Sequence, residues 1–198
     1  MVTLRPESTT DAYLGGSAVI DLDHPDVRAI HADLVGGVAD PVAAARAIYL
    51  FVRDRIRHSL DAGDQQVTLS ASDVLRHRTG LCYAKSHLAA ALLRLSGIPT
   101  GLCYQLLRDG DRLVLHGLVA VHFAGGWHRL DVRGNKPGVT AEFGLGAEAL
   151  AFDLDAALGE IDLPDLLVDA APSVVRVLGS GGNLSQARSE QRRVGKEC

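Results

Sequence analysis

A cysteine placed between a glycine turn and a strongly apolar run constrains this chain more than any other stretch. The residues Thr79-Gly80-Leu81-Cys82 lead toward Leu88–Leu95, which reads LAAALLRL. That run stops at Gly97-Ile98-Pro99, where glycine can form a left-handed cap and proline prevents continuation. The pattern predicts a buried helix with Cys82 in its first turn.

The predicted position of Cys82 favours a nucleophilic thiolate. The first turn of a helix has N–H groups without helical partners and the positive end of the helix dipole, and both stabilise an anion. The alternative is that Cys82 is a small buried hydrophobic residue, as free cysteines usually are. The segment alone leaves both interpretations open.

A hairpin further along the chain offers a base and a residue to orient it. Strand-like residues 113–123 and 127–132 flank Ala124-Gly125-Gly126. With a two-residue turn at Ala124-Gly125, Asp131 becomes the diagonal neighbour of His116 on one sheet face. A turn at Gly125-Gly126 keeps both on one face but further apart, and a three-residue turn would separate them.

With these residues in place, the sequence resembles the transglutaminase-like superfamily, whose core is papain-like. The resemblance runs from about Tyr13 to about Leu167 and is strongest at Gly80–Pro99 and in the hairpin from His116 to Asp131. A helical lead-in typical of small bacterial members precedes it, at Ile20–Pro25 and Ile48–Ile56.

The resemblance implies a Cys–His–Asp triad at Cys82, His116 and Asp131. It also implies an α+β fold, in which a helical layer containing the nucleophile helix packs on an antiparallel β meander. Two departures are visible. Many relatives have an aromatic residue two positions after the histidine, where this chain has Leu118, and the second donor of the family's oxyanion hole has no clear match.

Composition fits a protein with one well-buried core. The chain has 198 residues, 47% of them hydrophobic, and its net charge of −4 gives no basic footprint for nucleic acid. No run has transmembrane length, and the N-terminus lacks a signal-peptide pattern. The three cysteines, Cys82, Cys103 and Cys198, form no CxxC pair. We therefore expect no membrane partner and a reducing, cytoplasmic location.

The remaining sequence predicts the following elements. Helices are expected at 25–34 and from Asp40-Pro41 to about Arg57, the second with a buried stripe that packs on the Cys82 helix. That stripe consists of Val42, Ala45, Ile48, Tyr49, Val52 and Ile56. Residues 53–55 are predicted to be solvated and 58–67 to form a loop. A capped turn is expected at 70–76, and strands at 100–107, 112–123 and 127–132.

The C-terminal part is less regular. Residues 142–155 suggest a strand near Leu150 and Phe152, while 163–167 and 174–178 remain ambiguous. We expect a single domain over residues 1–178. Residues 179–198 have the composition of a disordered tail, and their ending resembles a translated sequencing adapter, so Cys198 supports no inference.

Three functions are consistent with these residues. The first is acyl transfer through a thioester, with water or an amine as acceptor, which would make the protein a cysteine peptidase or amidase or else a transglutaminase. The second is an inactive peptide-binding module of the same fold. The third, zinc bound by Cys82, Cys103 and a histidine, lacks the usual ligand spacing. We expect a peptide or protein amide as substrate and no cofactor. The sequence does not determine the oligomeric state.

Overall fold

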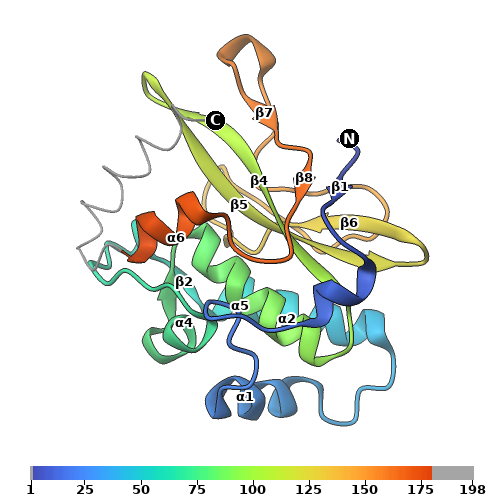
Figure 1. The fold of residues 1–198 in the computed structure, drawn as a ribbon. Helices are drawn as coiled ribbons and strands as arrows, with labels where there is room; N and C mark the ends of the chain where they lie inside the picture. Colours follow the sequence, from blue (N-terminus) through green and yellow to red (C-terminus); the bar gives the residue numbers. More distant parts are fainter. Residues whose placement is uncertain (1, 180–198) are drawn as a thin grey trace.

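In a computed structural model that describes residues 2–179, a layer of helices packs against one antiparallel sheet (Figure 1). The helical layer contains α1 (Pro25–Val35), α2 (Pro41–Arg55), α4 (Ala71–His77) and α5 (Cys82–Leu95). The sheet has the order β6-β5-β4-β7. Its strands are β4 (Thr100–Asp109), β5 (Arg112–Phe123), β6 (Gly126–Leu130) and β7 (Ile161–Asp162).

Short elements connect and extend these layers. Two parallel pairs form outside the main sheet: β1 (Arg5–Pro6) with β8 (Asp165–Leu166), and β2 (Arg57–His58) with β3 (Thr79–Gly80). The other short elements are η1 (Thr10–Leu14), α3 (Ser59–Ala62), η2 (Ala156–Leu158) and α6 (Pro172–Gly179). The predicted tail lies outside the described residues, apart from Gly179.

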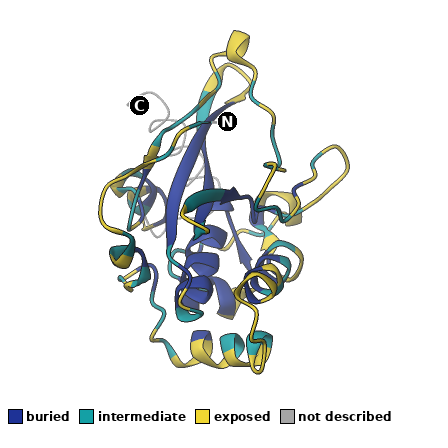
Figure 2. Ribbon diagram, turned by 90° about the vertical axis from the view of Figure 1, so that its right-hand side faces the viewer, coloured by how far each residue is buried: buried dark blue, intermediate teal, exposed yellow. Residues whose placement is uncertain are grey.

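Helix α5 is the centre of the core. Every residue from Cys82 to Arg94 is buried, because the helix has the sheet on one side and α1, α2 and α4 on others. Figure 2 shows this helix buried along its length while α1 remains largely exposed. Gly97, with φ +72°, turns the chain after the helix into β4. The expected buried helix beginning at Cys82 is confirmed.

The first two long helices begin where their caps are predicted. Asp40 accepts hydrogen bonds from the N–H groups of Val42 and Ala43, and the His24 side chain accepts one from Asp26 N–H. The stripe on α2 is buried from Ala45 to Ile56, but Val42 is 39% exposed, so its predicted burial is wrong.

Three further expectations need correction. Residues 58–67 are not simply a loop, because β2 pairs with β3 and α3 follows. Arg53 is not solvated: its side chain is only 10% exposed and bonds to Ala141 O and Glu142. No strand forms near Leu150 and Phe152. The ambiguous residues 163–167 and 174–178 contribute to β8 and α6.

Candidate active site

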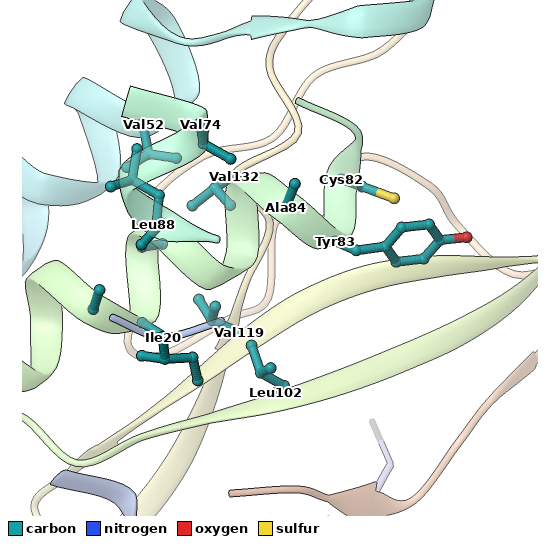
Figure 3. Close-up of a cluster of buried hydrophobic side chains, with 14 of the residues drawn as sticks. Ile20, Val52, Val74, Cys82, Tyr83, Ala84, Leu88, Leu102, Val119 and Val132 are labelled. Carbon is teal, nitrogen blue, oxygen red and sulfur yellow. The ribbon is translucent and has the colours of Figure 1, made fainter. Parts of the chain in front are cut away.

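Cys82 is the first residue of α5, and its side chain lies at the end of the helix beside β5 (Figure 3). The first intrahelical bond runs from Lys85 N–H to Leu81 O, at 2.9 Å. The helix itself therefore does not use the N–H groups of its first turn, and Leu81 offers no capping side chain. Cys82 Sγ also accepts a hydrogen bond from Gly117 N–H at 3.3 Å. Both features stabilise a negatively charged sulfur.

Glycine at position 117 allows the strand to come this close. A Cβ atom there would lie 2.9 Å from Tyr83 Cδ1 and 3.0 Å from Tyr83 Cα, which is closer than real contacts. The strand passes the first turn of α5 at the one position without a side chain. As a result its backbone N–H reaches Cys82 Sγ.

His116 and Asp131 are joined by a buried hydrogen bond of 2.8 Å between Nε2 and Oδ2. The β5–β6 register, with Val119 opposite Leu130, corresponds to a two-residue turn at Ala124-Gly125. Both turn residues have positive φ, 49° and 79°, as the favoured hairpin turn requires. Of the three turns considered from sequence, the structure adopts the one that brings His116 and Asp131 together.

Asp131 is held as an anion inside the protein. It has no exposed surface, and it accepts hydrogen bonds from the N–H groups of Arg133 (2.9 Å) and Ala151 (3.1 Å) as well as from His116. Burial alone would raise the pKa of Asp131, but the charge of His116 and these hydrogen bonds outweigh it and lower the pKa.

The same pairing charges the imidazole. Burial disfavours the protonated ring of His116, but attraction to Asp131 and to Cys82 outweighs burial and raises its pKa to about 10. His116 is therefore an imidazolium near neutral pH and a suitable partner for a thiolate at Cys82. This is the charge arrangement that an activated cysteine requires.

A segment without regular structure covers this pair, at the residues around Phe152 for which a strand was predicted. The Phe152 ring meets the His116 ring edge-on, with centroids 5.1 Å apart and planes at 90°. Its neighbour Ala151 donates to Asp131, and Arg133 Cζ lies over the Phe152 ring, 5.6 Å from the ring centroid. The segment that was expected to be a strand instead shields the His116–Asp131 hydrogen bond from water.

Two further residues beside the site were missed. The first is His58, which lies close to Cys82 because β2 pairs with β3. In that pairing His58 is opposite Gly80, two residues before Cys82. Its side chain is 7% exposed, and its Nδ1 atom has no hydrogen-bond partner. Burial, and after it the charge of Arg133, lowers the pKa of His58 to about 3, so its ring is neutral.

Lys85 is the second missed residue. It is fully buried one turn after Cys82, and its Nζ atom donates to Ile56 O (2.6 Å), Arg133 O (2.7 Å) and Arg53 O (3.3 Å). Burial lowers the pKa of Lys85 to about 7. The three hydrogen bonds of Lys85 hold the end of α2 and the segment after Asp131 against the nucleophile helix. A lysine in an otherwise apolar helix was the available signal.

A pocket of about 310 Å³ opens at this site and contains both Cys82 and His116 in its lining. Its apolar wall comes from Leu60, Leu107, Val114, Leu115 and Phe152. His58, Arg108 and Arg133 line it as well, and the acidic side chains Asp109, Asp153 and Glu160 complete it. The pocket can place an apolar side chain beside the sulfur.

Other residues considered from sequence lie apart from this pocket. His87 is fully buried with Nδ1 2.7 Å from Leu69 O, and Cys103 is buried in a second cluster with Tyr13 and Leu118. Burial raises the pKa of Cys103 to about 12. Among residues 2–179 no group of three or more His, Cys, Asp or Glu side chains could hold a metal ion. Within the same residues no helix is long and apolar enough to cross a membrane.

The chain is similar to one known family and to several solved structures. The model of the transglutaminase-like superfamily matches residues 28–132, which is just over half of the chain. No curated protein matches. A solved candidate cysteine protease from Cytophaga hutchinsonii is 19% identical, with a TM-score of 0.53 over 64% of this chain and 43% of that one.

Two other solved structures are more distant. One is described as a TGase, with 16% identity and a TM-score of 0.48 over 82% of this chain and 46% of that one. The other is the periplasmic domain of TgpA from Pseudomonas aeruginosa, with 20% identity and a TM-score of 0.45 over 64% and 48%. This chain spans less than half the length of each of the three proteins.

The fold is the papain-like one, in which a helix that begins at a cysteine packs against an antiparallel sheet carrying a histidine. The chain belongs to the transglutaminase-like superfamily. That family includes enzymes of the cysteine protease and transglutaminase types.

Proposed function

We propose that this chain is a thiol-dependent enzyme that hydrolyses an amide or peptide bond through Cys82, His116 and Asp131. One observation carries the proposal. His116, whose ring is hydrogen-bonded to buried Asp131, lines the same pocket as a cysteine at a helix N-terminus. The raised pKa of His116 supplies the imidazolium that a reactive thiolate needs.

In the proposed first step, Cys82 Sγ attacks the amide carbonyl carbon and the electron pair moves onto the carbonyl oxygen. When the tetrahedral intermediate collapses, the C–N bond breaks and the imidazolium of His116 gives its proton to the leaving amine. The acyl group remains as a thioester on Cys82. Asp131 keeps the imidazole oriented throughout and stabilises its charged form.

In the second step a water molecule attacks the thioester, and neutral His116 accepts its proton. The C–S bond then breaks, the carboxylic acid leaves, and the thiolate–imidazolium pair is restored. A primary amine in place of water would give a transglutaminase by the same steps. Because the thiol must stay reduced, we propose a reducing location such as the cytoplasm.

The oxyanion would be stabilised by two donors. The first is the backbone N–H of Cys82, which the helix does not use. We assign the second to the ring of His58, which lines the same pocket, is neutral, and has an N–H to donate. A neutral donor has an advantage here. It adds no positive charge beside Cys82 that would stabilise the resting thiolate and so lower its reactivity.

The test is turnover of a quenched fluorescent peptide library, with and without an added primary amine, by the wild type and by Cys82→Ala. We expect hydrolysis that Cys82→Ala abolishes. Iodoacetamide near neutral pH should label Cys82 faster than Cys103, because Cys103 is buried with a raised pKa. Cys103→Ala serves as the matched control and should still be labelled.

Two results would contradict the proposal. Equal slow labelling of both cysteines, together with no turnover, would favour the inactive peptide-binding module. Product formed only when the amine is present would instead assign the chain to the transglutaminases.

A further inference from the structure

A second cavity, of about 320 Å³, adjoins the catalytic pocket and has more basic than acidic side chains in its lining. His58 and Arg133 line both spaces and so form the wall between them. Five basic and two acidic side chains line this second cavity: Arg53, Arg57, Lys85, Arg133 and Lys136, with Asp54 and Asp61. A cavity of this size can hold one amino-acid side chain or a chain terminus.

The basic groups are not all neutralised by neighbouring carboxylates. Arg53 is paired with Asp54 and Glu142, and Arg57 with Asp64. Arg133 and Lys136, by contrast, share a single carboxylate.

That shared carboxylate is Asp61. The Arg133 guanidinium approaches it at 2.9 and 3.1 Å, and Lys136 Nζ at 2.7 Å. Two positive charges on one carboxylate leave one excess positive charge in this group, of which Arg133 also lines the catalytic pocket. Buried Lys85 donates only to carbonyl oxygens in these contacts, and its pKa of about 7 leaves the amine partly protonated near neutral pH.

We propose that this cavity is a subsite for a carboxylate carried by the amide substrate close to the scissile bond. The inference rests on the proposed function and adds the substrate class, which is an acidic peptide. The Arg133 fork is occupied by Asp61, so a substrate carboxylate would meet the point charge of Lys136, whose ammonium has further N–H groups to donate. A lysine side chain would be repelled from the same place. The carboxylate could belong to a Glu or Asp side chain or to a free C-terminus.

The experiment uses alanine pentapeptides, quenched and fluorescent, with Glu, Gln or Lys placed at each position in turn and with a free or amidated C-terminus. At one position the wild type should cleave the Glu peptide about 5- to 10-fold faster in kcat/KM than the Gln peptide, the scale of one partly exposed ion pair. The Lys peptide should be the poorest. A preference that follows only the free C-terminus would identify that terminus as the source of the carboxylate.

Lys136 is the residue to change, because its side chain is 40% exposed and its ammonium donates to Asp61 at the edge of the cavity. Lys136→Gln should reduce the ratio of Glu to Gln cleavage several-fold, and Lys136→Glu should reverse it. Arg76→Gln, which removes an exposed positive charge on α4, is the matched control and should leave the ratio as it is in the wild type.

Binding separates this inference from the proposed function. If no peptide is cleaved, the proposed function fails, and the same peptides titrated into Cys82→Ala by fluorescence anisotropy still test the subsite. Tighter binding of the Glu peptide, lost in the Cys82→Ala/Lys136→Glu double variant, would support it. Equal or weaker cleavage and binding of Glu peptides at every position would overturn it.

Discussion

The two histidines that line the catalytic pocket are buried to nearly the same extent, yet their pKa values move in opposite directions. The His116 side chain is 5% exposed and the His58 side chain 7%. The pKa of His116 rises to about 10, whereas that of His58 falls to about 3. Burial lowers the pKa of both rings, so the difference comes from their neighbours.

The neighbouring carboxylates contribute to the contrast, beside the attraction of Cys82 for His116 and the repulsion of His58 by Arg133. Asp131 lies 2.8 Å from His116, and the hydrogen-bond donors around it besides His116 are neutral backbone N–H groups. Asp61 lies 3.6 Å from His58 and already bonds to Arg133 and Lys136. Because the charge of Asp61 is already shared between Arg133 and Lys136, it stabilises a protonated His58 only weakly. The comparison shows that a partner's other contacts, and not its presence alone, decide whether a buried histidine is charged.

The largest expected effect is a loss of turnover when the charge beside His116 is removed. Asp131→Asn keeps the shape of the side chain but removes the charge that holds the imidazolium. Turnover should fall by about 10⁴, the scale of the same change in a serine protease triad. The measurement is kcat on a peptide that the wild type cleaves, together with a thermal melt to show that the variant is folded. Full activity in Asp131→Asn would remove this residue from the mechanism.

A smaller loss of turnover is expected when His58 is replaced. His58→Ala should lower kcat by about 10²–10³ with little change in KM, as expected for loss of one oxyanion donor. His58→Gln, which keeps an N–H donor, should recover part of the loss. His122→Gln is the matched control, because His122 is a half-buried histidine at the far end of β5. If His58→Ala turns over at the wild-type rate, the second donor lies elsewhere.

The smallest effect is on stability, and it has opposite signs for the two histidines. In the unfolded chain both rings titrate near pH 6.5. The folded protein holds His58 neutral, so stability is lost as the pH falls from about 6.5 toward about 3. It holds His116 protonated, so that contribution is present below about pH 6.5 and is lost as the pH rises toward about 10.

Thermal melting at pH 5, 7 and 9 of the wild type, His58→Gln and His116→Gln tests this. The His58 variant should flatten the acid side of the stability curve and the His116 variant the alkaline side. Two variants with the same pH profile as the wild type would show that the histidines titrate normally in the folded state.

Local patterns were sufficient for part of the site. The glycine cap and apolar run around Cys82 predict the beginning and end of α5 because these are signals within one turn of the chain. The hairpin is partly similar: the glycines mark its turn, and the period of two in the flanking strands decides which residues share a face with His116 once the turn is known. The sequence left three possible turns, and the positive φ of both turn residues shows which one forms.

Contacts between distant segments account for what was missed. His58 reaches the pocket only because β2 pairs with β3, a parallel contact of two residues on each side that has no periodic signature. Phe152 covers His116 from a segment without regular structure, so its apolar residues were mistaken for a strand. Lys85 lies in a helix that was predicted correctly, but its three carbonyl partners come from other segments. They are Arg53 in α2, Ile56 directly after α2, and Arg133 after Asp131.

The sequence by itself determined the nucleophile helix, the hairpin and the family to which their residues point, because each depends on neighbours within about twenty residues of chain. Only the tertiary structure decided the charge state of each histidine and the second, basic cavity. A pKa depends on burial and on every charge within several ångströms. For His58 and His116 those charges come from Asp61, Arg133 and Asp131, whose distances from the rings are set only when the layers pack together.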